Sequence, residues 1–323
     1  MITSSAPAQG VDLACAKLPP NRRHAFSWLG PLLILPVGLM AMLWCAASAE
    51  AGWQMVFEDN FDGSSLDLSK WYTRFIYNQG TLDHLNDEQQ RYRDGGHHVV
   101  QDGILQLIAT KPYNDGRKAP YESGMIRSKQ TFRYGYFEAR VKLPKGKGLW
   151  PAFWLNSDFD EHGRLAWPPE IDIFEYAPNG AEEKPNMIHA NVAVAKTTRA
   201  EDGTVSYADP EFNQRWNYYK APFDLTDDWH TFGLLWTADS ATMYLDGKKM
   251  LTKRYLWVYK DGSPAGPAHI LLNLAVGGKW AGKTGVDDSA LPAALQVDYV
   301  RVCQQSQTSS DTLCGGSKFT PQQ

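Results

Sequence analysis

Residues 170–175 read Glu-Ile-Asp-Ile-Phe-Glu, three acids separated by apolar residues that favour strands. Successive side chains of a strand point to opposite faces, so Glu170 and Asp172 share a face while Glu175 would point into the core. An ionised carboxylate buried there without a partner is very costly. One β-bulge between Asp172 and Glu175 would return the third acid to the face of the other two. The stretch therefore predicts a bulged strand that directs three carboxylates at one point.

Three converging carboxylates suit glycoside hydrolysis. A retaining enzyme uses one carboxyl to attack the anomeric carbon and a second, roughly 5 Å away, to protonate the leaving oxygen. Four strand steps span about 13 Å, so the two glutamate side chains must lean together over a curved sheet. Asp172 between them would keep the pKa values of the two glutamates apart. The alternative is a solvated acidic strand face, which the alternating isoleucines and phenylalanine make less favourable here.

The rest of the chain is typical of an all-β protein in one domain. Turn residues interrupt short apolar runs, no segment shows a long helical period, and Asp246-Gly247 predicts a hairpin. We expect a β-sandwich in residues 50–303 and a loosely structured tail in residues 304–323. Strands are predicted at residues 104–109, 134–143, 171–176, 188–195, 230–236, 241–246 and 269–276.

The N-terminal residues 1–49 resemble an export signal. Basic residues precede an apolar run from Phe26 to about Ala47, and the small residues Ala47-Ser48-Ala49 offer a cleavage site. The same run is long enough to serve as an uncleaved membrane anchor. We expect a secreted protein, extracellular or periplasmic, with a membrane-anchored form as the alternative.

Charge and cysteine usage agree with export. The net charge of −4, without a long basic run, argues against nucleic acid as a partner. Cys303 and Cys314 are the two cysteines that follow the leader, and in an oxidising compartment they would form a disulfide that holds the tail. Two free thiols are the alternative, whereas the absence of a nearby histidine argues against a metal site.

The chain resembles glycoside hydrolase family 16, the laminarinases, lichenases, agarases and their relatives. Residues 170–175 are similar to the bulged E-x-D-x-x-E signature of that family. The resemblance extends from about Val56 to Val302, and it implies a concanavalin-like jelly roll of two curved antiparallel sheets with a concave cleft. Further blocks that resemble the family are YGYFEAR at 134–140, GLWPAFW at 148–154, NLAVGGKW at 273–280 and VDYVRV at 297–302.

The resemblance assigns roles to residues of the cleft. Glu170 would be the nucleophile and Glu175 the acid/base, with Asp172 assisting. The twelve tryptophans include candidates for stacking against sugar rings, and each could instead be a core residue. The expected substrate-binding residues are Trp150, Trp154, Trp167, Trp280, His189, Arg127 and Asn86.

The resemblance also implies a structural calcium ion on the convex side, although catalysis itself would need no cofactor. Its ligands would be the backbone carbonyls of Asn60 and Gly103 and the side chain of Asp298. Oxygen-only ligands suit a hard cation. The alternative is that Asp298 is an ordinary acid at the end of a strand.

The expected function is that of an endo-acting, retaining β-glycanase, active on β-1,3-glucan or mixed β-1,3/1,4-glucan. Alternatives on the same fold are a transglycosylase and a glycanase for exopolysaccharides. A non-catalytic glycan-binding sandwich is the alternative of another class, but it would not need three aligned acids. The expected partner is the polysaccharide substrate, and we expect a monomer.

Overall fold

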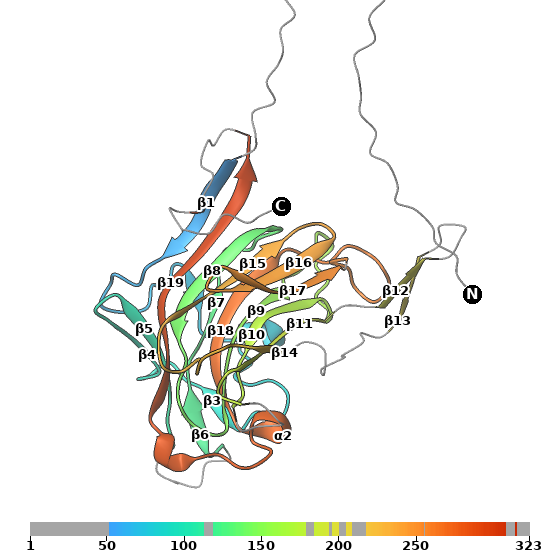
Figure 1. Cartoon of the computed structure of the whole chain (residues 1–323). Coiled ribbons are helices and arrows are strands. Elements are labelled where there is room, and N and C mark those ends of the chain that lie inside the picture. The colour runs from blue at the N-terminus through green and yellow to red at the C-terminus, as the bar shows by residue number, and fades with distance from the viewer. Residues whose placement is uncertain are drawn as a thin grey trace, which may run out of the picture. The chain divides into compact units, whose positions relative to one another are not determined.

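In the computed structural model, most strands fall into two antiparallel sheets that pack against each other (Figure 1). The structure describes residues 52–112, 119–178, 184–193, 196–199, 205–208, 218–254, 256–307 and Cys314. These residues all belong to one compact unit, residues 49–323. The predicted leader, residues 1–49, lies outside the described residues, and so does most of the predicted tail.

Sheet A has the strand order β17-β16-β15-β8-β19-β5-β4, and β1 pairs with β19 beyond this path. Strand β19 is the longest strand that the structure describes and pairs along its length with β5, β8 and β1. The strands of this sheet are β1 (Gly52–Asp59), β4 (His98–Gln101), β5 (Ile104–Ala109), β8 (Gly135–Lys142), β15 (His230–Trp236), β16 (Ser240–Leu245), β17 (Lys248–Arg254) and β19 (Ala293–Ser306).

Sheet B has the order β14-β11-β10-β9-β18-β7-β2 and carries the acidic strand β10 near its middle. Its strands are β2 (Trp71–Tyr72), β7 (Met125–Ser128), β9 (Leu149–Ser157), β10 (Glu170–Glu175), β11 (Met187–Ala193), β14 (Tyr218–Lys220) and β18 (Ala268–Val276). Smaller elements are the pairs β3 (Gln90–Tyr92) with β6 (Tyr121–Ser123) and β12 (Lys196–Arg199) with β13 (Val205–Ala208), and the short helices α1 (Tyr77–Gly80), α2 (Gly278–Ala281) and η2 (Asp288–Ala290).

The hydrophobic core lies between the two sheets. Along β8, Phe137, Ala139 and Val141 are fully buried in this core, as their alternation with polar residues predicts. From sheet B, residues such as Phe153 and Leu272 enter the same cluster. Burial of apolar surface on one face of each sheet therefore leaves the other face of sheet B available for a site.

The predicted strands are present, and their ends agree with the observed ends to within two residues. The predicted hairpin also forms, since Asp246 and Gly247 connect β16 to β17. Both residues have positive φ angles, 48° and 74°, as a tight turn between twisted strands requires. Local turn chemistry and side-chain alternation thus account for most of the sandwich.

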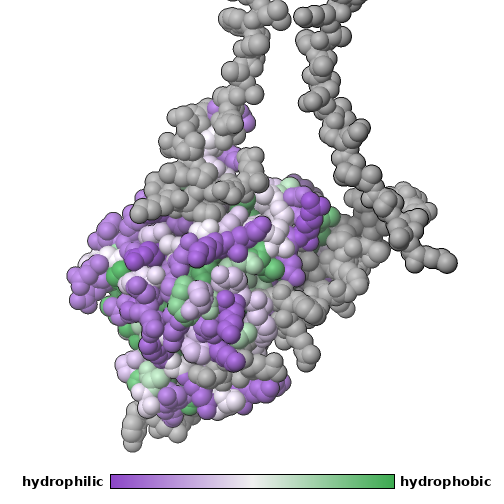
Figure 2. Space-filling view, in the orientation of Figure 1, coloured by the Kyte–Doolittle hydropathy of each residue, from purple (hydrophilic) through white to green (hydrophobic). Residues whose placement is uncertain are grey.

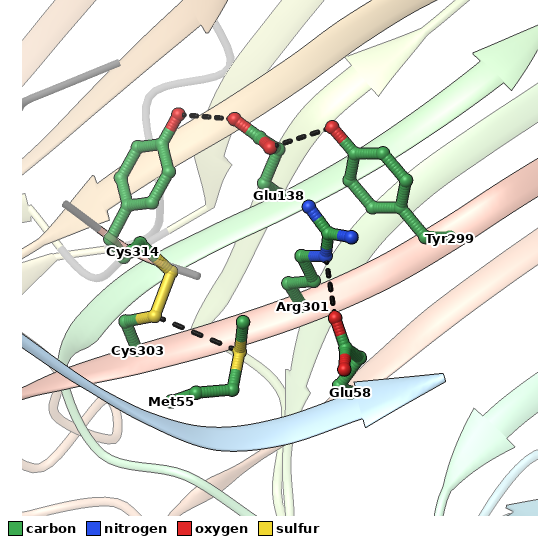
Figure 3. Close-up of a disulfide and its surroundings, with 8 residues drawn as sticks. Met55, Glu58, Glu138, Tyr299, Arg301, Cys303 and Cys314 are labelled. Carbon is green, nitrogen blue, oxygen red and sulfur yellow. Dashed lines mark hydrogen bonds and ion pairs between the residues drawn. A yellow bond between two sulfur atoms is a disulfide. The ribbon is translucent and has the colours of Figure 1, made fainter. Parts of the chain in front are cut away.

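The outer face of sheet A carries a disulfide and a buried acid (Figure 3). Cys303 of β19 is joined to Cys314, with a Cα–Cα distance of 5.6 Å, and its Sγ lies 3.8 Å from Sδ of Met55 on β1. Glu138 of β8 accepts hydrogen bonds from the hydroxyl groups of Tyr136, at 2.9 Å, and Tyr299, at 2.8 Å. The tail is therefore attached covalently to the central strand of this sheet.

Hydrophilic residues cover most of the described surface that faces the viewer in Figure 2, and hydrophobic residues form small separate patches on it. The helices within the described residues are too short and too polar to cross a membrane.

Candidate active site

Strand β10 contains the predicted bulge. Asp172 pairs with Asn191 of β11, and Glu175 pairs with His189, so three steps along β10 correspond to two along β11. The pairing with β9 shifts at the same place, between Asp172 and Phe174. Ile173 and Phe174 are both fully buried, so the extra residue lets two consecutive side chains enter the core. Glu175 consequently faces the same side as the first two acids.

All three acids line one cavity of about 550 Å³ on the face of sheet B that is turned away from the core, which we call the cleft face. A cavity of this size can hold a small part of a polymeric ligand. Its other lining residues are Tyr77, Leu85, Asn86, Trp150, Trp167, His189, Asn191 and Trp280.

Indole and imidazole groups hold the two glutamates. Trp167 donates its Nε1–H to Glu170 Oε2 at 3.2 Å, and Trp150 donates its Nε1–H to Glu175 Oε1 at 3.1 Å. His189 Nδ1 lies 2.8 Å from the second oxygen of Glu175, so the imidazole donates a proton there when this carboxyl is ionised. Each glutamate is thus oriented by a side chain that itself lines the cavity.

Two of the three acids, Glu170 and Asp172, keep their protons to higher pH than isolated carboxyl groups do. Desolvation raises the pKa of Glu170 above its ordinary value, and the neighbouring charge of Glu175 raises it further. Burial also raises the pKa of Asp172, and the charges of Glu170 and Glu175 add to this effect. Asp172 shares a hydrogen bond with Glu170, which a protonated Asp172 donates to an ionised Glu170. The site therefore retains a proton near neutral pH, as acid/base chemistry requires.

Aromatic rings form one wall of the cavity. The ring of Trp280 stands almost perpendicular to that of Trp150, with centroids 4.9 Å apart, and lies 5.5 Å from the ring of His189. Trp280 belongs to α2, which Gly277 and Gly278 open with positive φ angles. Gly277 has φ 75° and ψ −144°, a backbone conformation that residues with a Cβ atom rarely adopt, so glycine is favoured there.

A hydrogen-bonded loop holds Asn86 beside that wall. Asn86 has a positive φ of 50°, which asparagine tolerates better than most residues. Glu88 accepts hydrogen bonds from the backbone N–H of Leu85 at 3.1 Å and from Gln90 Nε2 at 2.7 Å. Asp87 accepts a hydrogen bond from the backbone N–H of Lys279 at 2.9 Å, so the loop of Asn86 is connected to the helix that carries Trp280.

Two predicted substrate-binding residues do not line this cavity. Trp154 is only 7% exposed, donates its Nε1–H to Asn273 Oδ1 at 2.8 Å and packs against Phe75. It lies on the expected face, but the segment around Phe75 covers it. Arg127 is also buried, and it lines a different cavity from the acids. The other predicted binding residues, Trp150, Trp167, Trp280, His189 and Asn86, do lie together around the acids.

Sequence reasoning missed Tyr77, Leu85 and Asn191, which also line the cavity. Asn191 could have been found, because it lies two residues after His189 on one strand and must share its face. Tyr77 and Leu85 belong to an irregular segment between β2 and β3, for which neither strand nor helix periodicity offers a signal.

Two of the residues expected to bind calcium, Asn60 and Asp298, lie near the same part of β19. Asn60 directly follows β1, where Asp59 pairs with Val300, and Asp298 lies at a register shift of β19. The Asn60 carbonyl oxygen lies 3.9 Å from the point where a Cβ atom on Gly103 would stand, so the backbones of these two residues are close together. Asp298 also pairs with Arg140 through one carboxylate oxygen. The donor set is oxygen-only and fits a calcium ion.

Comparisons with known proteins agree with this geometry. The sequence profile of the glycosyl hydrolases family 16 matches residues 86–301. A β-glucanase of Rhodothermus marinus is 32% identical over 77% of this chain and 85% of the relative. A glucan endo-1,3-β-glucosidase of Cryptopygus antarcticus is 33% identical over 79% of this chain and 93% of the relative.

Solved structures show the same fold. The laminarinase of Rhodothermus marinus superposes with a TM-score of 0.61 and 28% identity, covering 79% of this chain and 99% of that one. The endo-β-1,3-glucanase of Pyrococcus furiosus gives a TM-score of 0.60 and 30% identity, covering 78% and 95%. The sandwich is thus the predicted jelly roll, with its cleft on sheet B.

Proposed function

We propose that this chain, which belongs to glycosyl hydrolases family 16 and is a glycoside hydrolase, is an endo-acting, retaining enzyme that cleaves β-1,3-glucan or mixed β-1,3/1,4-glucan. The substrate of the family's glucanases is a polysaccharide, and the relatives described above carry glucanase names. The observation that carries the proposal is the bulge of β10, which brings Glu170, Asp172 and Glu175 to one cavity.

The proposed mechanism is a double displacement. Ionised Glu170 attacks the anomeric carbon while protonated Glu175 gives its proton to the departing glycosidic oxygen. Glu175, now ionised, then takes a proton from a water molecule that attacks the glycosyl–enzyme ester, and the sugar leaves with Glu170 restored. Asp172 holds the oxygen of Glu170 by a hydrogen bond, and His189 and Trp150 stabilise the ionised form of Glu175.

A product profile tests this function. The protein should release oligosaccharides of several lengths from laminarin and lichenan early in the reaction, and none from agarose. Proton NMR of the first product should show the β anomer. A protein that binds laminarin but releases no reducing ends would be a glycan-binding sandwich instead. Early release of the α anomer would contradict the retaining mechanism.

We also propose that Asn60, Gly103 and Asp298 hold a structural calcium ion far from the acids in sequence and on the other sheet. Calcium would then stabilise the fold without taking part in the reaction. Its removal should lower the melting temperature by several degrees, and calcium, but not magnesium, should restore it. Asp298→Asn should melt at the lower temperature with or without calcium, whereas an unchanged melting temperature after chelation would contradict the site.

Export and a monomeric state complete the proposal. The apolar N-terminal segment and the Cys303–Cys314 disulfide both support a location in an oxidising compartment. Light scattering of the purified protein should give the mass of one chain.

A further inference from the structure

A second cavity, of about 440 Å³, lies outside the active site and has no role in the proposed mechanism. We call it the distal cavity. It combines charged side chains with aromatic rings. Its lining residues are Tyr72, Ile76, Gln79, Gly80, Arg127, Lys129, Asp158, Phe159 and His269.

Strand register places the distal cavity on the cleft face. Asp172 pairs with Trp154, which pairs with Leu271 of β18. Leu271 in turn pairs with Arg127, which pairs with Tyr72 of β2. Directly paired residues on neighbouring strands point to the same face, so this row runs from a catalytic acid to the distal cavity. Three strand steps separate the backbones of Asp172 and Arg127, about 14 Å.

A packed cluster separates the two cavities. Phe75, Trp154 and Leu271 are buried together there, and Tyr77 packs against them from the covering segment. Tyr77 lines the catalytic cavity, whereas its neighbour Ile76 lines the distal one. The distal cavity is therefore a separate site on the same face.

Arg127 is the most unusual residue of the distal cavity. Only 5% of it is exposed, and its Nε–H donates to the backbone carbonyl of Arg74 at 3.1 Å. Its Nη1 lies 3.1 Å from Nε2 of His269. Among the described residues, no carboxylate lies within the 4.0 Å of an ion pair with this guanidinium. The negative charge of Asp158 attracts this guanidinium from beyond that distance. A buried guanidinium also suits a planar anion, such as a carboxylate, as a further partner.

The tautomer of His269 supports this arrangement. His269 Nδ1 lies 2.7 Å from the carbonyl oxygen of Ser128, so this nitrogen carries a proton and donates it. Nε2 accepts from Arg127 when the ring is neutral and donates to Asp158 when the ring is protonated. Asp158, the carboxylate of the cavity, lies 3.3 Å from the same Nε2 and also accepts the backbone N–H of Phe159. Two permanent cations, Arg127 and Lys129, therefore face one carboxylate.

Exposed aromatic rings flank these cations. Tyr72 is 43% exposed and Phe159 is 50% exposed, although large apolar side chains are normally covered. Arg127 and Lys129 lie over the ring of Tyr72, at 4.3 Å and 4.7 Å from its centroid. The ring of Phe159 thus offers an apolar surface beside a positively charged pocket, a combination that suits a sugar ring carrying an acidic group.

We propose that the distal cavity binds a negatively charged sugar unit, such as a uronic acid, of a glycan chain. Arg127 pairs with the carboxylate through its guanidinium, Lys129 adds a second positive charge, and Phe159 contacts the sugar ring. The cavity thereby recognises acidic units on the same face as the acids that cleave the chain. This binding is independent of hydrolysis and of the glucan that is cleaved.

Titration calorimetry of the full, disulfide-bonded chain carrying Glu170→Gln tests the proposal. The probes are cellobiose and its uronic acid analogue, in which the terminal sugar carries a carboxylate. The acidic disaccharide should bind at least tenfold more tightly at low salt, and added salt should weaken this preference. Lys129→Gln and Phe159→Ala, both at exposed positions, should each weaken its binding at least fivefold, and Arg127→Lys should weaken it further.

Controls locate the binding. Lys249→Gln, an exposed change on β17 of the other sheet, and Trp150→Ala in the catalytic cavity should leave the affinity for the acidic disaccharide unchanged. Equal affinity for the two disaccharides, or a loss of acidic binding in Trp150→Ala, would overturn the proposal. Inorganic sulfate that competes as well as the sugar acid would reduce the site to a simple anion site and refute sugar recognition. Because Lys129 and Phe159 are exposed, these results do not depend on whether Arg127→Lys folds.

Discussion

Strand β10 of sheet B and strand β8 of sheet A both carry acids on the face turned away from the core, yet the two regions differ in how these acids are satisfied. Glu138 on β8 is buried and accepts hydrogen bonds from two tyrosine hydroxyls. On β10, three acids crowd one cavity, and burial and mutual repulsion raise the pKa values of Glu170 and Asp172.

The comparison shows what makes a buried acid reactive. The hydroxyl groups of Tyr136 and Tyr299 donate hydrogen bonds that offset the cost of burying Glu138. Burial and the nearby carboxylate in turn raise the pKa values of these two tyrosines. On β10, the neighbours of each acid include other acids, which repel its negative charge unless they are protonated. A proton must therefore remain in the site. A buried acid with sufficient donors supports the fold, whereas crowded acids at a cavity can exchange protons with a ligand.

The largest expected effect is that of Glu170→Gln. The amide cannot attack the anomeric carbon, so kcat on laminarin should fall by at least about a thousandfold while the fold is retained. Circular dichroism and a reducing-sugar assay measure the two properties. Glu138→Gln is the matched control on sheet A and should keep its specific activity. Wild-type rates in Glu170→Gln would remove Glu170 from the mechanism.

A smaller loss is expected at Asp172. Asp172→Asn can still donate a hydrogen bond to Glu170, whereas Asp172→Ala cannot. We expect kcat to fall by about a hundredfold in the alanine variant and by clearly less in the asparagine variant, because a hydrogen bond to a charged group contributes about 1.5–3 kcal/mol. If the two variants are equally impaired, Asp172 acts through its negative charge rather than as a donor.

Glu138→Ala should affect stability and leave catalysis intact. It removes an acceptor from two buried tyrosine hydroxyls, so the free energy of unfolding should fall by about 1–3 kcal/mol. Urea denaturation followed by tryptophan fluorescence measures this loss, and initial rates at 25 °C should match the wild type. Reduced activity without loss of stability would mean that Glu138, on the outer face of sheet A, affects catalysis in the cleft on sheet B.

The smallest expected effect is a shift in pH dependence. Glu170 must be ionised to attack, and desolvation together with the charge of Glu175 raises its pKa, so activity is lost as the pH falls through a value above the ordinary one. Glu175→Gln removes that charge and should move the acid limb of kcat/KM to lower pH. An aryl glycoside whose leaving group needs no protonation isolates this step. An unmoved limb would mean that desolvation alone sets the pKa of Glu170.

Sequence reasoning reached the sandwich, the bulge and the acids because each depends on neighbours in the chain. Side chains alternate between the two faces of a strand, so a Glu175 outside the core requires a bulge between Asp172 and Glu175, where the register does shift. Burial of Trp154 could not be foreseen in the same way. It depends on Phe75, which packs against it from a segment distant in sequence, and on Tyr92 of β3, which belongs to the same buried cluster. The side chain faces the predicted side, and only the tertiary covering excludes it from the cavity.

The position of Arg127 outside the catalytic cavity has a related cause. Side-chain alternation predicts the strand of Arg127 and the face to which it points. Which cavity it lines depends instead on the cluster around Phe75, which separates the two cavities of the cleft face. Residues in irregular segments, such as Tyr77 and Leu85, offer no periodic signal at all. Sequence patterns therefore predict which face a residue occupies better than they predict what covers that face.

The pairing of β1 with β19 has a practical consequence for protein engineering. Gly52 pairs with Ser306, so the beginning of β1 and the end of β19 lie side by side (Figure 1). A short flexible peptide could join these positions, and new termini could be opened in an exposed hairpin such as that at Asp246-Gly247. Such a circular permutant would keep every strand pairing of the sheet that supports the cleft, while freeing the choice of where a fused module is attached.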